Sequence, residues 1–361
     1  MMTEMAFMSD MVIPPGEYLE EVLEDANLSQ AELARRMGRP SQAINEIIKG
    51  DKAITPDTAL QLEQVLGVSA QLWSNLETEF RLILAKQHQL LDVKKEVGLV
   101  SNFPYLELSK LNLVEATRDK LKKVIELRRF FGVSSLKNIC TVKEFAPAFR
   151  QDEKSSVSHE ALATWLRVGH VIASKKETSE FCKEKLKLAI PELKKLTNLS
   201  EPNQLIIEIQ KQLVECGVVL ALVPVFPKSY ITGATFWVTK NKAVIMMSMR
   251  GAWSDIFWFS LFHEIGHILL HDKRVTFLEN GKLDPQYQKQ ESEADTYAQK
   301  TLIPPEEYIN FLMRRDFSYE SIKCFSDKLG VFPGIVTGRL QHDKKLPHTI
   351  NHHRIRYKWS S

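Results

Sequence analysis

His263 and His267 stand four residues apart in the segment His263-Glu264-Ile265-Gly266-His267. Residues four apart lie on one face of a helix, so the two imidazoles can bind one metal ion. Glu264 directly follows the first histidine, which lets its carboxylate reach a water on the metal and act as general base. The spacing predicts a Zn²⁺ site for metal-assisted peptide hydrolysis. A buried helix with two satisfied histidines is the alternative, but it leaves Glu264 buried without a partner.

A second predicted helix contains the run 291–298 and Leu302 and is ended by Pro304-Pro305. It offers the third ligand that a catalytic zinc ion needs beside an open position. Glu291 and Asp295 are four residues apart and share a face, so Glu291 can bind zinc while Asp295 orients a ligand histidine. Glu293 points about 200° away from Glu291 around the helix and is the competing ligand. The spacing favours Glu291 over Glu293.

Two further residues near the motif have open roles. His271 follows His267 by four residues and is a fourth imidazole near the metal, a group that orients a ligand, or a residue at the helix end. Arg250 precedes the motif helix and either stabilises the oxyanion of a tetrahedral intermediate or forms a surface salt bridge.

The composition favours a cytoplasmic protein of two or three domains. The chain has 361 residues with 44% hydrophobic content, and no run approaches the ~20 apolar residues of a membrane span. The N-terminus lacks the basic region of a signal peptide. The four cysteines are scattered without a CxxC pair, which predicts free thiols in a reducing compartment and no thiolate metal site. They are Cys140, Cys182, Cys216 and Cys324.

Charge is unevenly distributed along the chain. Residues 1–75 hold 12 acidic and 5 basic side chains, a net charge of −7, whereas residues 86–200 hold 22 basic and 14 acidic ones, a net charge of +8. The last residues of the chain are also basic. Such runs are usually solvated faces, and they can also contact nucleic acid or an acidic partner.

The N-terminal residues predict a helix-turn-helix. Ser29 begins a capping box with Glu32, and the short helix that follows is broken at Gly38-Arg39-Pro40. Ser41 is expected to cap a second short helix, Ser41–Lys49. Two short helices joined by a tight, glycine-containing turn define this motif, although a small helical protein-interaction bundle is the alternative.

The second helix is the predicted recognition helix. We expect Ser41, Gln42 and Asn45 to contact bases, since amides can hydrogen-bond adenine edges. Phosphate contacts are expected from three other side chains. These are Gln30, Arg36 and Lys49.

The remaining pattern predicts a mainly α protein with a small β-sheet (α+β). Residues 77–95, 113–131 and 136–200 have helical spacing. Apolar runs at 218–223, 233–238 and 243–249 predict strands, with a turn at 240–242. The predicted domains are a helix-turn-helix bundle at 1–80, a helical middle region at 81–200 and a C-terminal zincin-like metallopeptidase domain at 201–361.

Two resemblances match these segments. Residues 13–76 resemble the Xre-type DNA-binding domain of HigA-type antitoxins, through Leu28-Ser29-Gln30-Ala31-Glu32-Leu33-Ala34, Asn45-Glu46-Ile47-Ile48-Lys49-Gly50 and Ile54-Thr55-Pro56-Asp57-Thr58-Ala59. Residues 205–305 resemble the ImmA/IrrE metallopeptidases, through His263–His267 and the 291–298 run followed by Leu302-Ile303-Pro304.

The resemblances imply a transcriptional regulator with a zinc-dependent endopeptidase domain that cleaves helix-turn-helix repressors. The implied partners are a double-stranded DNA operator, a protein substrate that is a helix-turn-helix repressor, a toxin protein, and a second copy of the chain in a homodimer. No membrane partner is expected. The alternative is a non-catalytic HigA-type antitoxin or repressor, whose C-terminal domain serves sensing or dimerisation.

Overall fold

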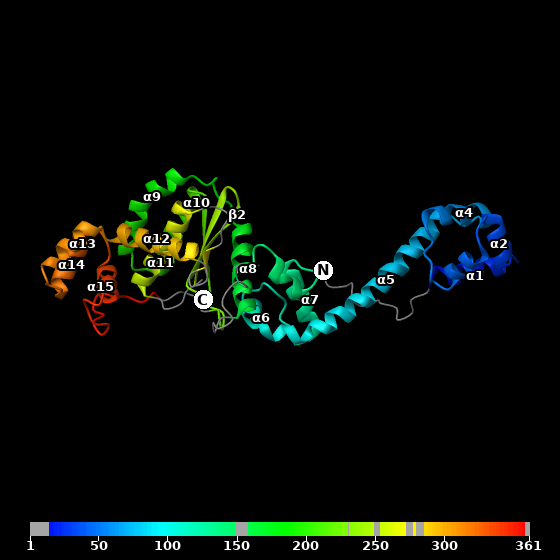
Figure 1. Ribbon diagram of the computed structural model, residues 1–361, viewed down its shortest axis with the longest axis horizontal. Coiled ribbons are helices and arrows are strands. Elements are labelled where there is room, and N and C mark those ends of the chain that lie inside the picture. The colour runs from blue at the N-terminus through cyan, green and yellow to red at the C-terminus, as the bar shows by residue number, and fades with distance from the viewer. Residues whose placement is uncertain are drawn as a thin grey trace. The chain divides into compact units, whose positions relative to one another are not determined.

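The computed structural model describes residues 14–146, 148, 158–229, 231–248, 253–271, 277–278 and 285–357. It divides into two compact units, Met1–Val97 and Gly98–Ser361, each of which is described by itself (Figure 1). The predicted domain limits at residues 80 and 200 stay predictions.

The first unit holds the predicted helix-turn-helix. Its helices are α1 (Pro15–Asp25), α2 (Gln30–Met37), α3 (Ser41–Ile48), α4 (Pro56–Leu66) and α5 (Ala70–Glu96). The turn between α2 and α3 contains Gly38 at φ 64°, a left-handed conformation that favours glycine. Leu19, Leu33, Ile44 and Trp73 belong to one buried core, so the apolar faces of these helices position α3.

Two local predictions in this unit need correction. Ser29 accepts a hydrogen bond from the Glu32 backbone at 3.2 Å, but the Glu32 carboxylate pairs with Arg35 and Arg36. The expected Ser41 cap is wrong: Pro40 is the capping residue without a side-chain bond, and Ser41 is already helical. A proline before the helix fixes the extended backbone there, so no side-chain cap is required.

Beyond α4, the observed helix boundaries also differ from those that the sequence predicts. The predicted helix 77–95 is the second half of α5, which begins after the Ser69 cap. The predicted helix 113–131 begins only at Lys120, because Asp119 caps α7 (Lys120–Phe131). Leucine-rich spacing therefore identified the helices, whereas capping side chains set their limits.

The second unit begins with short elements and then longer helices. They are η1 (Val97–Asn102), α6 (Tyr105–Lys110), η2 (Leu136–Thr141), α8 (His159–Lys175), α9 (Lys183–Lys195), η4 (Leu196–Asn198) and α10 (Pro202–Glu215). The expectation that the chain is helical from 136 to 200 is therefore only partly right. Residues 176–182 lie outside any helix, and Pro191 stands inside α9.

A small sheet forms the centre of this unit. Its strands are β1 (Val218–Val223), β2 (Gly233–Thr239), β3 (Lys242–Ser248) and the short β4 (Phe277–Leu278), in the order β1-β3-β2-β4. β1 runs parallel to β3, and β2 pairs antiparallel with β3 and β4. The three predicted strands are confirmed within a residue or two, and the fold is mainly helical with a small sheet.

Helices cover both faces of the sheet (Figure 1). On one face, α8 approaches closely because Gly169 has no Cβ to collide with Met246, and His170 stacks on Phe236 at 4.1 Å. On the other face, Leu220, Ile245 and Met247 join the core formed with α10 and α11. Successive strand residues point to opposite faces, so Thr235, paired with Ile245, faces α11.

The remaining helices are α11 (Ser254–Leu270), α12 (Pro285–Leu302), α13 (Pro305–Met313), α14 (Tyr319–Leu329) and α15 (Pro333–His342). The chain end returns to the start of α11, where Arg354 forms a bidentate pair with Asp255 at 2.8 and 2.9 Å. Among the described residues, no helix is both long and apolar enough to cross a membrane. All four cysteines are free thiols, as expected.

Candidate metal centre and DNA-reading helix

The HExxH segment lies on α11, which is buried on nearly every side. His263, Glu264 and His267 are each no more than 2% exposed. A helix that is hydrophobic all round is normally a core element. Polar groups buried in such a helix need partners, and those partners come from α12 and β2.

Glu291 on α12 meets both histidines. The Nε2 atoms of His263 and His267 lie 2.9 Å apart, and each lies 3.3 Å from a carboxylate oxygen of Glu291. The three residues therefore form a group able to hold one metal ion. The structure brings Glu291 to the histidines, whereas Glu293 contacts His271 instead.

Gly266 explains how α12 comes so close to α11. A Cβ added there would lie 3.2 Å from Tyr297 Cδ1 and 3.3 Å from the Ala294 Cα. Both distances are tighter than most real Cβ contacts. Gly266 thus lets α12 pack close enough to α11 for Glu291 to reach the two histidines.

Each histidine is oriented through its other ring nitrogen. Nδ1 of His263 lies 2.8 Å from Asp295 Oδ1, and Nδ1 of His267 lies 3.0 Å from Nδ1 of His271. His271 Nε2 in turn lies 3.1 Å from Glu293 Oε2. If each carboxylate accepts an N–H, both ligand histidines carry their proton on Nδ1, which leaves the Nε2 lone pairs facing Glu291.

Glu264 points from α11 toward the sheet. The Thr235 hydroxyl donates a hydrogen bond to Glu264 Oε2 at 2.5 Å. At Gly233, two residues earlier on the same strand face, an added Cβ would collide with Glu264 Oε1. Sequence reasoning missed Thr235 and Gly233. The available signal was a small and a polar residue, two apart, on one face of a strand predicted beside the motif helix.

Electrostatics at this centre favour a positive charge on His263 and disfavour one on His267. Burial would lower the pKa of His263, but Asp295, Glu291 and the charge of Glu264 raise it to about 10. Burial and the neighbouring His263 lower the pKa of His267. Burial would raise the pKa of Glu291, but the two imidazoles lower it to about 2. Anionic carboxylates therefore surround a point where a cation is favoured.

Two further observations indicate that these residues fit a zinc ion. Two imidazole nitrogens and one carboxylate are a ligand set of catalytic zinc sites. Glu291 Oε1 is buried and accepts no hydrogen bond from any described residue, which a metal–ligand bond would remedy. The oxyanion candidate Arg250 lies outside the described residues.

The predicted DNA-reading side chains share the outer face of α3. Ser41, Gln42, Asn45 and Lys49 are exposed, while Ala43, Ile44 and Ile47 turn into the core. The Gln42 amide donates to Glu46 at 2.8 Å. No role was predicted for Glu46 from the sequence, although the spacing of four residues predicts such a pair.

The two other predicted DNA contacts lie on α2. Arg36 is exposed and pairs with Glu32 at 2.9 Å. Gln30, the first residue of α2, is half-buried.

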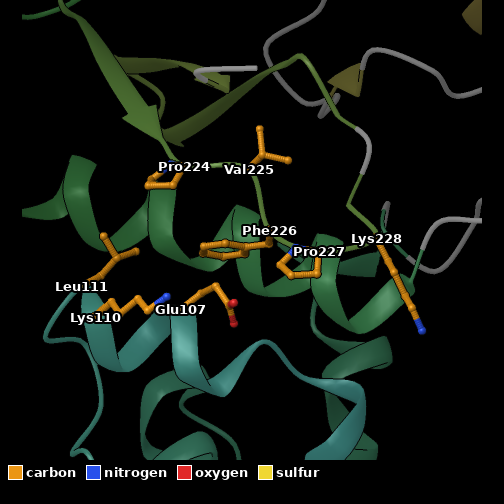
Figure 2. Close-up of a pocket in the computed structure, with 8 residues that line it drawn as sticks. All are labelled: Glu107, Lys110, Leu111, Pro224, Val225, Phe226, Pro227 and Lys228. Atoms are coloured by element: carbon orange, nitrogen blue, oxygen red, sulfur yellow. The ribbon is translucent and has the colours of Figure 1, made fainter. Parts of the chain in front are cut away.

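Figure 2 shows a separate pocket between α6 and the segment that follows β1. Its volume is about 710 Å³, and Phe226 and Lys110 belong to its lining. None of its lining residues belongs to the metal centre.

Family models match both halves of the chain. A helix-turn-helix model matches residues 19–73, and an IrrE N-terminal-like domain model matches residues 226–340. The first match spans α2 and α3, and the second spans α11 and α12. The IrrE-like peptidase family is typically metal-dependent, in agreement with the His/His/Glu group.

Curated relatives match through the helix-turn-helix half. The HTH-type transcriptional regulator YddM of Escherichia coli is 33% identical over 87 residues, which cover 24% of this chain and 90% of the relative. Virulence-associated protein I of Dichelobacter nodosus is 42% identical over 76 residues, 21% of this chain and 70% of the relative.

Solved structures of antitoxins are also similar to part of this chain. Antitoxin HigA of Pseudomonas aeruginosa, determined with the higBA promoter, is 34% identical over 22% of this chain and 86% of its own, with a TM-score of 0.21. A HigA-family antidote protein of Coxiella burnetii is 32% identical over 23% of this chain and 92% of its own, with a TM-score of 0.22.

The chain therefore belongs to the helix-turn-helix family of DNA-binding transcriptional regulators. In this member, an IrrE-like peptidase domain is fused to the regulator domain.

Proposed function

We propose that this regulator is a cytoplasmic, zinc-dependent endopeptidase that cleaves a regulatory protein. The observation that carries the proposal is the meeting of His263, His267 and Glu291 around one point, with Glu264 on the same helix. An ordinary buried helix has no reason to gather two imidazoles and a carboxylate, because each must be desolvated.

In this proposal His263, His267 and Glu291 hold the zinc ion. When bound, zinc supplies Lewis-acid polarisation of the scissile carbonyl and acidifies water. Asp295 and His271 hold the ligand imidazoles in the tautomer that leaves Nε2 without a proton, and Glu293 supports His271.

Glu264 acts as the general base. It takes the proton from the attacking water and later delivers it to the leaving amine. The hydroxyl of Thr235 donates to one carboxylate oxygen of Glu264 and so fixes the orientation of the other. Gly233 keeps the space beside that second oxygen open.

The regulator domain binds a double-stranded DNA operator through α3. Ser41, Gln42 and Asn45 read base edges, while Gln30, Arg36 and Lys49 meet phosphate. The amide of Asn45 has no hydrogen-bond partner among the described residues, so it is ready for a base edge, whereas Gln42 must leave Glu46 first. A homodimer places two such helices in half-sites about one helical turn apart.

A helix-turn-helix repressor is the proposed substrate, because the two domains of this chain would then act on one regulatory circuit. A toxin protein is a further candidate partner, since residues 13–76 resemble the DNA-binding domain of HigA-type antitoxins.

A non-catalytic repressor or antitoxin is the second candidate function. The relative YddM supports it, because 87 matched residues make up 90% of that protein. A regulator of this family therefore needs little beyond the helix-turn-helix part. In this alternative the C-terminal unit serves sensing or dimerisation.

Replacement of Glu264 by Gln separates the two functions. Glu264→Gln keeps the side-chain shape and the ligands, so zinc content and DNA binding should stay at wild-type levels. Cleavage should fall at least about 100-fold, the lower range for loss of general-base catalysis. Glu320→Gln, at an exposed position in the first turn of α14, is the matched control.

The assay incubates zinc-loaded protein with itself, with the product of the neighbouring gene and with candidate repressors, and fragments are identified by mass spectrometry. Equal cleavage by wild type and Glu264→Gln would eliminate Glu264 as the base. Absence of cleavage in every mixture, including extract of stressed cells, would favour the repressor function.

A further inference from the structure

A second pocket lies next to the candidate metal centre. It is lined by residues of α11, α12 and α15 and by Thr232, which directly precedes β2. Its volume is about 300 Å³. On α11 it is lined by Phe259 and Ser260, which lie one helical turn before His263 and Glu264. The ring centroids of Phe259 and His263 are 6.3 Å apart, so the pocket wall adjoins the first proposed ligand.

α12 and the residue before β2 connect the metal centre to the pocket in the same way. Gln299 on α12 lies one turn after Asp295, which hydrogen-bonds His263. Thr232 directly precedes Gly233, the residue that faces Glu264. The pocket wall therefore continues from α11, α12 and the start of β2, and α15 completes it.

The lining favours an uncharged occupant. Its apolar walls are Ile256, Phe259, Leu302, Ile303 and Ile335. The charged or ionisable side chains at the pocket already have partners: Asp255 pairs with Arg354, and both Arg339 and His342 contact Asp343. A charged occupant would lose its hydration without gaining an unpaired counter-ion.

The volume of the pocket and the exposure of one wall residue also favour an uncharged, apolar occupant. A cavity of about 150 Å³ accepts a benzene ring in a protein interior, so a volume of about 300 Å³ accommodates a leucine, methionine or phenylalanine side chain. Ile256, one of the lining residues, is 40% exposed. Covering it by an apolar side chain would remove that surface from water.

We propose that this pocket selects peptide substrates with a large apolar side chain next to the scissile bond. The inference rests on the proposed metallopeptidase function and adds its substrate class. The pocket accepts an aliphatic or aromatic side chain of the substrate. The carbonyl group of the scissile bond, next to that residue, then lies at the metal centre.

Capped amino-acid hydroxamates test this without requiring catalysis, because the hydroxamate binds zinc while the side chain enters the pocket. Affinities of the zinc-loaded full chain are measured by calorimetry for acetohydroxamate and for the N-acetyl hydroxamates of alanine, leucine and aspartate. We expect the leucine compound to bind at least tenfold more tightly than the alanine compound. The aspartate compound should bind no more tightly than the alanine compound.

Ile256→Ala should reduce the preference for leucine at least threefold and leave acetohydroxamate affinity unchanged. Ile207→Ala is the matched control, since Ile207 is 62% exposed on α10 and lies outside the pocket. It should retain the full preference.

The outcomes separate the two proposals. If acetohydroxamate binds but leucine gives no advantage, or if Ile256→Ala keeps the whole advantage, the pocket is not the specificity site while the metal centre stands. If acetohydroxamate does not bind the zinc-loaded protein, the metal centre itself is wrong and the pocket inference is overturned with it.

Discussion

The proposed recognition helix α3 and the candidate metal centre place their functional groups in opposite ways. On α3 the predicted base-reading side chains lie within five residues of sequence and are exposed. At the metal centre, the groups come from α11, α12 and β2, and the two histidines and Glu264 are buried. One site is a surface of a single helix, and the other exists only when three elements pack.

This difference decides how each site responds to change. A side chain on the outer face of α3 can be removed without opening the core, so its loss should affect DNA recognition and little else. A buried polar group at the metal centre holds others in place, so its removal leaves partners unsatisfied. Mutations in the two regions should therefore have separable effects.

The largest expected effect is loss of the metal. In His263→Ala/His267→Ala, zinc content should fall from about one per chain to the background of elemental analysis, since two of three ligands are gone. Operator affinity should stay at the wild-type level. His348→Ala/His352→Ala, a pair of exposed histidines near the chain end, should keep its zinc. Unchanged metal content in the first variant would refute the ligand assignment.

The converse experiment alters DNA recognition alone. Gln42→Ala/Asn45→Ala should reduce discrimination between operator and unrelated DNA by about 1–3 kcal/mol for each lost base contact. Zinc content should not change. Gel-shift titration at fixed salt measures the effect, and Gln64→Ala, at an exposed position on α4, is the control. Wild-type discrimination by the double variant would show that α3 does not read bases.

A smaller effect is expected from the residues that orient the ligands. Asp295→Asn should weaken zinc affinity about 10–100-fold, because the amide no longer accepts the Nδ1 hydrogen of His263 as a carboxylate does. Glu293→Gln should weaken it less, since Glu293 acts through His271. Competition with a fluorescent chelator measures the affinity, and exposed Asp327→Asn serves as control. Equal affinity of Asp295→Asn and wild type would argue against an orienting role.

The smallest expected effect is pH dependence restricted to the second unit. Burial lowers the pKa of His170 to about 4, from about 6.5 in the unfolded chain. As pH falls below 6.5, the unfolded state therefore binds the proton first, and stability decreases until pH 4. Between pH 7 and pH 5 the loss from His170 is about 2 kcal/mol.

Hydrogen exchange followed by mass spectrometry can locate this loss. Protection of the β2 backbone amides, next to which His170 stacks on Phe236, should decrease on acidification. In His170→Phe, the loss of stability between pH 7 and pH 5 should be about 2 kcal/mol smaller than in the wild type. The replacement keeps an aromatic ring against Phe236 without a titrating group. If both proteins lose protection equally between pH 7 and pH 5, His170 is not the group responsible.

Much of the fold followed from local pattern. The glycine-containing turn before Pro40, the cap at Ser29 and the strands at 218–223 and 233–239 all depend on neighbours in sequence. Helix starts were less predictable. α7 begins at Lys120 because the Asp119 carboxylate binds the Leu121 and Lys122 backbone amides, and leucine spacing alone extended it too far back.

The sequence by itself determined which residues could do chemistry. Spacing of four residues puts His263 beside His267, and Glu291 beside Asp295, on any helix. The same local rule exposes Gln42 and Asn45 while Ile44 and Ile47 are buried. These relations are properties of one helix and need no tertiary contact.

Only the tertiary structure decided which of those residues meet. Glu291 reaches the histidines and Glu293 reaches His271 because α12 packs on α11 across Gly266. Thr235 reaches Glu264 because its strand face turns toward α11. No spacing rule relates residue 235 to residue 264. Their contact is set by the packing of a sheet on a helix, which depends on the shape of the whole core.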